Sequence, residues 1–369
     1  MKLAIYTGVL GSGGIEAVAV NHALFFAQMG LMVDYIIDLP PSNVDYYQSL
    51  TTAGVRVKTL FDKRPKLFIV KKVFRLISLI REEKYTCFHF HLSYPSSLLY
   101  VFVVKLLGVP SVTTSHARGT MKSSPYFKIY QNICRHLFAP ASNNRYAVSQ
   151  EAGLWLYGNK KFDVMFNPIN VDRFKYSKEN RTKVRDHYGL DDKILLVGHV
   201  GRLDKVKNHR FLIETFSEMV KQNPLCRLLI IGSGGEEENI KQTISQHKLN
   251  NYVFYVNHTD CVERYLSAMD VLVFPSIQEG LPTVLLEAQA SNLPIIASTG
   301  VPRQIALSNN VSFLDLNDGP LFWAQKVFER VSRGEPRNST NELLQSKCSI
   351  NRICSELIDI YSNISLKRN

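Results

Sequence analysis

One stretch of the sequence predicts a strand end, a loop and a helix in direct succession: Pro275-Ser-Ile-Gln-Glu-Gly-Leu-Pro-Thr-Val-Leu-Leu-Glu-Ala-Gln-Ala290. It continues the apolar run Val271–Pro275, which is typical of a buried strand. Pro282 is expected to open the helix, because a proline at the first helical position loses no hydrogen bond. Gly280 lets the backbone approach a ligand closely, and the N–H groups at such a helix start attract phosphate.

Two glutamates of this stretch, Glu279 and Glu287, are eight residues apart. Along a helix that separation is at most ~12 Å, which is similar to the reach of a nucleotide-sugar from its sugar to its ribose. Each carboxylate can accept hydrogen bonds from a pair of hydroxyls, with phosphates between them on the helix start. Such a pair is common by chance, so the strand-loop-helix setting carries the interpretation.

Short apolar runs alternate with longer amphipathic segments on both sides of this stretch. Strand-helix-strand alternation favours parallel sheets with helices on both faces. The segment Asn167–Asp192 breaks the rhythm with charges and a proline, and we interpret it as a connection. The sequence therefore predicts an α/β protein of two Rossmann-like, doubly wound domains, residues 1–171 and 172–348, with a C-terminal helix in 349–369 that packs back on the first. Ligands bind beyond the carboxyl ends of such strands, so we expect the two domains to face each other across a cleft.

Composition limits the partners rather than the fold. The 369 residues carry a formal net charge of +12, which suits phosphate-bearing substrates, nucleic acid or an anionic membrane face. The six cysteines are scattered without a CxxC motif, so we expect reduced thiols and no zinc site. Met1-Lys2 leads directly into an expected strand, and the apolar stretch Leu98–Leu107 is too short to span a bilayer. We therefore expect a cytoplasmic protein whose membrane contact, if any, is peripheral on the inner face.

The pattern Glu279-x7-Glu287, in the setting EGLPTVLLEAQA, resembles the signature of the retaining glycosyltransferases of family 4, which have the GT-B fold. Further segments are similar to that family in order and spacing: Gly11–Glu16, Thr114-Ser-His116, Asn167–Asp172, Gly201-Arg202, Lys207-Asn208, Ile231–Gly234 and Asp270–Ser276. The resemblance covers most of the chain and is strongest in residues 195–300. One departure is Gly300-Val-Pro-Arg-Gln304, where many relatives have Gly-Gly-x-x-Glu.

The resemblance implies roles for five residues. Arg202 and Lys207 would hold the donor diphosphate and stabilise it as the leaving group. Glu279 would bind hydroxyls of the donor sugar, and Glu287 those of the ribose. His116 would lie near the sugar from the opposing domain.

The resemblance also implies contacts from two loops. Gly280, Leu281 and Pro282 would line the donor, while Gly13 and Gly14 would approach the diphosphate and the acceptor. It implies front-face transfer with retention, without a metal or cofactor, and the sequence contains no Asp-x-Asp motif. The donor would be a nucleotide-sugar, first of all a UDP-sugar, and the acceptor a glycan or a polyprenyl-diphosphate-linked sugar in capsule, exopolysaccharide or O-antigen assembly.

Some of these residues also have simpler interpretations. His116 could be a satisfied histidine at a strand end. His89 and His91 alternate along an expected strand, and we interpret them as sheet residues. The glycine-rich loop at Gly11–Gly14 could be a plain turn, and it lacks the full G-x-G-x-x-G spacing of a nicotinamide dehydrogenase.

The basic residues 61–84 leave a further choice open. They interleave lysines and arginines with apolar residues, which suits either an ordinary helix or docking on anionic lipid. A nucleic-acid-binding protein would also be basic, but the sequence has no recognised motif of that class, so no nucleic-acid partner is expected. A non-catalytic nucleotide-sugar-binding protein of the same fold is the other alternative.

Overall fold

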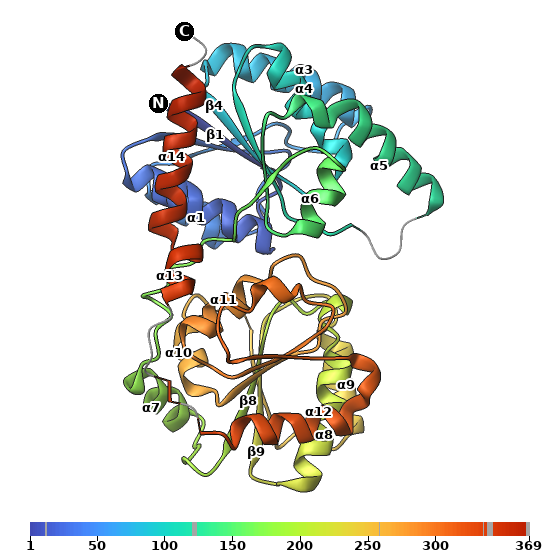
Figure 1. Cartoon of the computed structure of the whole chain (residues 1–369), viewed down its shortest axis with the longest axis vertical. Helices are drawn as coiled ribbons and strands as arrows, with labels where there is room; N and C mark the ends of the chain where they lie inside the picture. Colours follow the sequence, from blue (N-terminus) through green and yellow to red (C-terminus); the bar gives the residue numbers. More distant parts are fainter. Residues whose placement is uncertain (12, 120–123, 258, 335, 338–341, 367–369) are drawn as a thin grey trace. The chain divides into compact units, whose positions relative to one another are not determined.

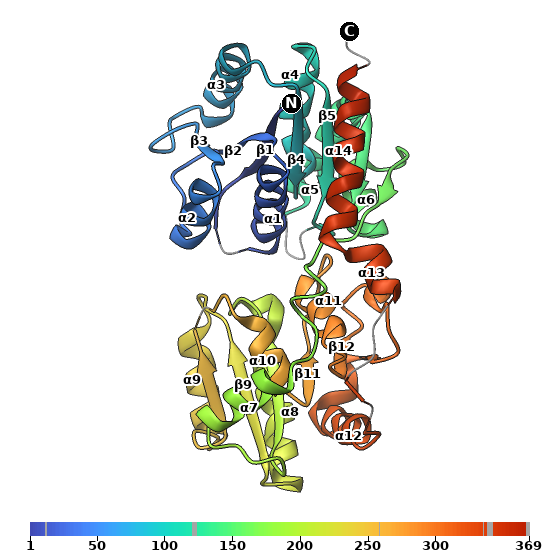
Figure 2. The same cartoon turned by 90° about the vertical axis from the view of Figure 1, so that its left-hand side faces the viewer.

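The computed structural model describes residues 1–11, 13–119, 124–257, 259–334, 336–337 and 342–366. The chain divides into two compact units (Figures 1 and 2). Unit 1 is Met1–Pro168 with Ile350–Asn369, and unit 2 is Ile169–Ser349. The division expected from the sequence, after residues 171 and 348, differs from these boundaries by at most a few residues. The predicted cleft between the domains stays a prediction.

Unit 1 is built on a seven-stranded sheet in the order β3-β2-β1-β4-β5-β6-β7. All of its strand pairs are parallel. The strand order reverses between β1 and β4, which makes that junction the topological switch point of the sheet. The strands are β1 Lys2–Gly8, β2 Met32–Ile37, β3 Arg56–Thr59, β4 Cys87–Leu92, β5 Ser111–Ser115, β6 Asn144–Ala147 and β7 Asp163–Val164.

Helices α1 and α14 cover one face of this sheet, as Figure 1 shows. Apolar residues of both helices share a core cluster with β1 and β2, and Tyr361 of α14 stacks edge-on against Phe26 of α1. The C-terminal helix thus closes the core formed by the first strands of the chain. The helices of unit 1 are α1 Gly14–Gln28, α2 Val44–Thr52, α3 Phe68–Glu83, α4 Leu98–Leu106, α5 Pro125–Phe138, α6 Gln150–Tyr157 and α14 Ile350–Leu366.

Unit 2 repeats the same plan with a six-stranded parallel sheet in the order β10-β9-β8-β11-β12-β13. This is the strand order of a classic dinucleotide-binding fold, and its switch point lies between β8 and β11. The four inner strands are fully or largely buried, as parallel strands covered on both faces require, while the edge strands β10 and β13 are partly buried. The strands are β8 Leu195–Val200, β9 Cys226–Ile231, β10 Val253–Val256, β11 Val271–Phe274, β12 Ile295–Ser298 and β13 Val311–Leu314.

The segment interpreted as a connection contains a helix that the sequence did not predict. Helix α7 has almost no apolar face, which hid it from periodicity. It is held instead by Arg181 and Arg185, which pair with Asp270 at 2.8 and 3.3 Å. The helices of unit 2 are α7 Lys178–His187, α8 His209–Gln222, α9 Glu237–Gln246, α10 Val262–Ala268, α11 Thr283–Ala290, α12 Gly319–Val331 and α13 Glu342–Cys348.

Other expectations concern the cysteines and the membrane. All six cysteines are free thiols, and five of them are buried. Within the described ranges, no helix combines the length and the apolar character needed to cross a bilayer. The two doubly wound parallel sheets predicted from the sequence are confirmed.

Candidate active site

The predicted donor residues of unit 2 follow the two strands that flank its switch point. Strand β8 ends at Val200 and leads into Arg202 and Lys207, and β11 ends at Phe274 and leads into Glu279. Because neighbouring parallel strands end at the same edge of the sheet, both loops emerge side by side. Ligands of such sheets bind at this edge.

Lys207 and Glu279 meet there directly. The Lys207 ammonium lies 2.7 Å from the Glu279 carboxylate, and both side chains are largely buried. Phe274, the last residue of β11, places its ring 4.6 Å below the same ammonium. Asp204 caps the 3-10 turn Lys205–Lys207 by accepting from the backbone N–H of Lys207 at 3.2 Å. These contacts fix the lysine at the strand edge with its charge facing a carboxylate.

Arg202 lies on the same loop but is more exposed. Its guanidinium pairs with Asp204 at 2.7 Å, while 60% of its side chain is open to solvent. The Asp204 carboxylate therefore orients both cations of the loop. It pairs with the guanidinium of Arg202 and accepts a hydrogen bond from the backbone N–H of Lys207. Sequence reasoning gave no role to Asp204, which lies two residues after Arg202, or to Phe274, which lies inside the segment Asp270–Ser276.

Two glycines allow the loops around Arg202 and Glu279 to pack closely against the neighbouring backbone. A Cβ added to Gly232, whose φ is +150°, would lie 1.9 Å from the carbonyl oxygen of Gly201. A Cβ on Gly300 would lie 2.2 Å from the carbonyl oxygen of Ile277, and the Gly300 carbonyl accepts from the Glu279 N–H at 3.1 Å. The glycine turn after β9 and Gly300 after β12 thus shape the backbone around Arg202 and Glu279.

Glu287 lies on α11, one helix after this loop. Its side chain is only partly exposed, and burial raises its pKa to about 7; the charge of Arg173 opposes that rise and Glu263 adds to it. Glu263 itself pairs with Arg173 at 3.0 Å. Sequence reasoning missed Arg173, which lies more than 100 residues away and is brought close only by folding. Near neutral pH the Glu287 carboxyl is therefore close to its midpoint of ionisation.

The loop before α11 differs slightly from the prediction. The helix begins at Thr283, and Pro282 is its N-cap with an extended backbone rather than its first residue. Leu281 and Pro282 are buried, and Gly280 is partly exposed. The predicted start of the helix is therefore wrong by one residue.

The predicted residues of unit 1 lie at the corresponding edge of its own sheet. His116 follows β5, is 8% exposed, and shares a 2.9 Å hydrogen bond with His91. Burial lowers its pKa to about 3, so the imidazole is neutral at neutral pH. Gly13 is the N-cap of α1 and Gly14 its first residue. A Cβ on Gly13 would lie 2.2 Å from the Glu16 carboxylate, which folds back over the helix start.

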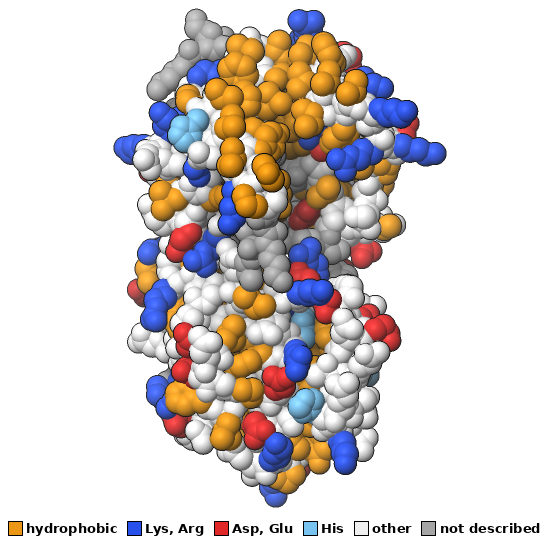
Figure 3. Space-filling model, turned by 90° about the vertical axis from the view of Figure 1, so that its right-hand side faces the viewer, with side chains coloured by type: hydrophobic (Ala, Val, Ile, Leu, Met, Phe, Trp, Pro, Cys, Tyr) orange, Lys and Arg blue, Asp and Glu red, His pale blue; other side chains and the backbone are white. Residues whose placement is uncertain are grey.

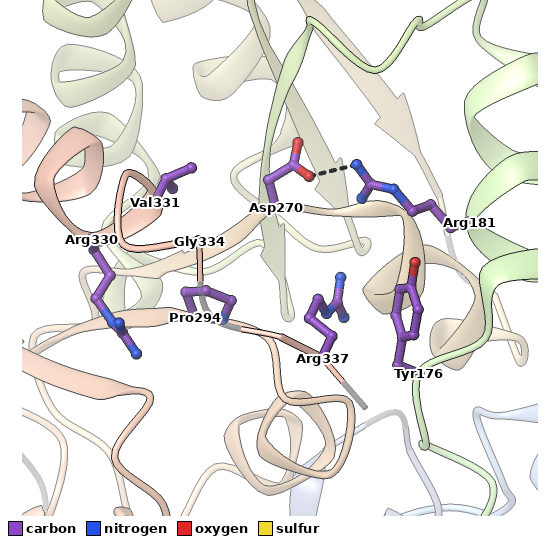
Figure 4. Close-up of a pocket in the computed structure, with 8 residues that line it drawn as sticks. All are labelled: Tyr176, Arg181, Asp270, Pro294, Arg330, Val331, Gly334 and Arg337. Atoms are coloured by element: carbon purple, nitrogen blue, oxygen red, sulfur yellow. Dashed lines mark ion pairs between the residues drawn. The ribbon is translucent and has the colours of Figure 1, made fainter. Parts of the chain in front are cut away.

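A separate cavity of about 280 Å³ in unit 2 does not coincide with these residues (Figure 4). It is lined by Asp270 and Pro294, which immediately precede β11 and β12. It therefore opens at the amino ends of the strands, opposite the donor residues. Its arginines have structural partners: Arg181 pairs with Asp270, and Arg337 donates to backbone carbonyls including that of Met269 at 2.7 Å.

Comparison with known proteins adds independent information. The family description Glycosyltransferase Family 4 matches residues 12–173, and Glycosyl transferases group 1 matches residues 180–311. Putative glycosyltransferase EpsF of Bacillus subtilis (strain 168) is 25% identical over 296 residues, which are 77% of this chain and 76% of EpsF. An Escherichia coli protein, UDP-Gal:alpha-D-GlcNAc-diphosphoundecaprenol alpha-1,3-galactosyltransferase, is 23% identical over 317 residues, 81% of each chain.

Solved structures agree on the fold. The crystal structure of HepE from Anabaena in complex with UDP matches with a TM-score of 0.80 at 16% identity, over 98% of this chain and 100% of that one. At this identity the match shows the architecture, which is GT-B. The two family matches, which together span most of the chain, show that it belongs to the group 1 glycosyltransferases with a family 4 N-terminal domain, and is a glycosyltransferase.

Proposed function

We propose that this enzyme transfers a sugar from a nucleotide-sugar, first of all a UDP-sugar, to a glycan or polyprenyl-diphosphate-linked acceptor in surface polysaccharide assembly. The choice of UDP is supported by the UDP bound to HepE and by the named donor of the E. coli relative. The same relative's name includes a diphosphoundecaprenol acceptor, and the net charge of +12 suits an anionic acceptor.

The observation that carries the proposal is the Lys207–Glu279 ion pair at the switch point of unit 2. An incoming diphosphate would take the Lys207 ammonium as its own partner, with Arg202 as a second cation. Glu279 would then accept hydrogen bonds from hydroxyls of the donor sugar. Gly280, Leu281 and Pro282 would form the wall beside it.

The proposal includes the remaining predicted contacts. Glu287 would accept from the two ribose hydroxyls, which favours its ionised form. In unit 1, the neutral His116 would donate to or accept from a sugar hydroxyl without adding charge. Gly13 and Gly14 would admit the diphosphate or the acceptor at the α1 N-terminus, in exchange for the Glu16 carboxylate.

The proposed chemistry is front-face substitution with retention at the anomeric carbon. The bond from this carbon to the phosphate oxygen breaks, and a bond to the acceptor oxygen forms on the same face. The acceptor proton passes to an oxygen of the departing diphosphate. Lys207 and Arg202 stabilise the negative charge that develops on the leaving group, which is where fixed cations accelerate a reaction most.

The test is a panel of nucleotide-sugars scored first by thermal shift and then by product analysis. A ligand that binds only the folded state raises the melting temperature. We expect a UDP-sugar to give the largest shift, and NMR of the product to show the donor's anomeric configuration. An inverted product would overturn the mechanism, and no shift and no turnover with any activated sugar would overturn the proposal.

We further propose that unit 1 docks on anionic membrane through α5 and the basic residues 61–84. Helix α5 differs from an ordinary surface helix in two ways: its polar Gln131 is buried against Ser96, and it contains no acidic residue. Large apolar side chains face solvent instead, as the face in Figure 3 shows: Tyr126, Ile129, Tyr130, Ile133 and Leu137. Exposed apolar side chains with nearby cations favour an interfacial helix.

Vesicle cosedimentation tests this contact. We expect the chain to bind phosphatidylglycerol vesicles more strongly than phosphatidylcholine vesicles, and less at high salt. The double substitution Tyr126→Ser with Ile133→Ser should abolish binding, whereas Leu225→Ser, at an exposed leucine of unit 2, should not. Equal binding by the two variants would contradict the assignment to α5.

A further inference from the structure

Four histidines lie together in the interior of unit 1. His22 is on α1, His89 and His91 are on β4, and His116 follows β5. All four side chains are buried, with exposed fractions of 8% or less. Sequence reasoning gave His89 and His91 no function, and it did not consider His22.

Three of these histidines form a cluster with the geometry of a metal site. One ring nitrogen each from His22, His89 and His91 lies within 4.8 Å of the others. His89 and His91 are two residues apart on one strand, so both point to the same face of the sheet, where α1 brings His22 against them. The rings of His22 and His91 have centroids 5.3 Å apart.

His22 has no evident reason to be polar in an apolar core. Neither of its ring nitrogens has a hydrogen-bond partner among the described residues. A buried polar group left in this state destabilises the fold, because it has lost its hydrogen bonds to water without gaining others. A leucine would fill the same space without that cost. A ligand bound to a ring nitrogen would explain why the residue is a histidine.

His91 is arranged as metal-binding histidines usually are. Its Nδ1 is 2.9 Å from His116 Nε2, while its Nε2 has no partner within the described part of the chain. Ligating histidines typically use one nitrogen for the metal and donate from the other to a neighbouring acceptor. Coordination through Nε2 would place the proton on Nδ1, from which it is donated to His116.

His89 would have to give up one existing contact. Its Nδ1 lies 2.6 Å from the Tyr361 hydroxyl and its Nε2 lies 2.8 Å from the Thr114 hydroxyl. The three ligand nitrogens of a zinc site lie about 3.4 Å apart, since Zn–N bonds are about 2.0–2.1 Å. The cluster would therefore tighten by side-chain rotation, within the reach of imidazole rings.

From this geometry we infer that His22, His89 and His91 bind one late first-row transition-metal ion, with Zn²⁺ as the reference ion. Imidazole nitrogens prefer zinc, copper and nickel to magnesium or calcium. Three neutral imidazoles leave one position of a tetrahedral zinc ion for solvent. The ion would join α1 to β4 inside unit 1. We assign this ion no step in the proposed sugar transfer, in which Arg202 and Lys207 of unit 2 stabilise the leaving group.

Metal counting on the full chain tests the inference. After chelation and dialysis against Zn²⁺, we expect about one zinc per chain by elemental analysis, and a higher melting temperature than the stripped protein. His22→Leu should abolish both effects. His247→Leu, at an exposed histidine of unit 2, should retain both.

Two results would overturn the site. One is that neither wild type nor His22→Leu retains zinc, as expected if a buried water satisfies His22. The other is equal retention by wild type and His22→Leu at one ion per chain, which would place the metal elsewhere. Cobalt absorption needs no variant: wild type loaded with Co²⁺ should show the intense visible bands of a tetrahedral site, and only the weak bands of hydrated cobalt would contradict the inference.

Discussion

A lysine–carboxylate pair lies next to an aromatic ring in each unit, and the two pairs differ in what surrounds them. In unit 1, Lys72 Nζ lies 2.6 Å from Asp38 and 3.9 Å from the centre of the Tyr100 ring. In unit 2, Lys207 Nζ lies 2.7 Å from Glu279 and 4.6 Å from that of Phe274. The two ammonium groups therefore have almost the same immediate neighbours.

The Lys72–Asp38 pair is enclosed by neighbouring groups, and we call it the closed pair. The Lys207–Glu279 pair lies at a strand edge, and we call it the open pair. Lys72 is on the 16-residue helix α3 with 5% of its side chain exposed, and Asp38 also accepts from the Tyr6 hydroxyl at 3.0 Å. Lys207 ends a three-residue turn and is 15% exposed. A pair enclosed by rings and a helix can only hold the fold together. A pair on a short turn at a strand edge can exchange one partner for a ligand.

The largest effect is expected in turnover, from removal of the open pair's cation. Lys207→Met should lower kcat by about 10²–10³-fold, the cost of losing one group that stabilises a leaving charge. Initial rates with the best donor of the panel measure it. Lys205→Met, an exposed lysine on the same turn, is the control and should keep most activity. Equal losses of kcat in both variants would mean that the Lys207–Glu279 pair has no specific role in turnover.

The closed pair should instead govern stability. Lys72→Met leaves the Asp38 carboxylate largely buried without its partner, which should cost about 3 kcal/mol or more. Urea unfolding followed by circular dichroism would measure it. Lys71→Met, at the exposed neighbouring lysine, should change the free energy of unfolding by less than about 0.5 kcal/mol. A Lys72 variant as stable as the Lys71 variant would show that this pair does not hold unit 1 together.

The glycine turn that supports the open pair allows a third test. Gly232→Ala should destabilise the protein by about 2 kcal/mol, because its Cβ would meet the Gly201 carbonyl oxygen at 1.9 Å and its φ is +150°. Gly235→Ala is the matched control, since its Cβ would meet no atom within 4 Å. The melting temperatures of the two variants measure this difference in stability. If Gly232→Ala had the melting temperature of wild type, the loop after β8 would move easily away from the added Cβ.

The smallest effect concerns pH and Glu287. Its pKa in the folded protein, about 7, lies above its ordinary value of 4.5. The group therefore contributes stability below pH 4.5 that is lost as pH rises through 7. If only the ionised carboxylate binds the ribose, donor affinity should rise by about tenfold at most between pH 6 and pH 8. Calorimetric titration at both pH values measures this rise.

Glu287→Gln separates that effect from other titrations. The amide cannot ionise, so donor affinity should be weaker but nearly independent of pH over the same range. An unchanged pH dependence in this variant would assign the titration to another group.

Much of the fold could be predicted from the sequence, because buried parallel strands and the helices between them carry strong periodic patterns. The segment around Val271–Ala290 predicted its strand, loop and helix to within one residue at the helix start. Helix α7 was missed because arginine pairs with Asp270, not an apolar face, hold it in place. Lys72 belongs to the basic stretch 61–84, yet its side chain is buried beside Asp38.

The local motifs can all be recognised from the order of residues: the glycine turns, the two glutamates, and the cations after a strand. These are properties of neighbouring residues, so spacing is enough to recognise them. The tertiary structure alone decided which distant groups meet: Lys207 with Glu279, Arg173 near Glu287, and His22 with His89 and His91. Such encounters depend on the order of strands in the sheet and on which helix covers which face, and local spacing contains neither.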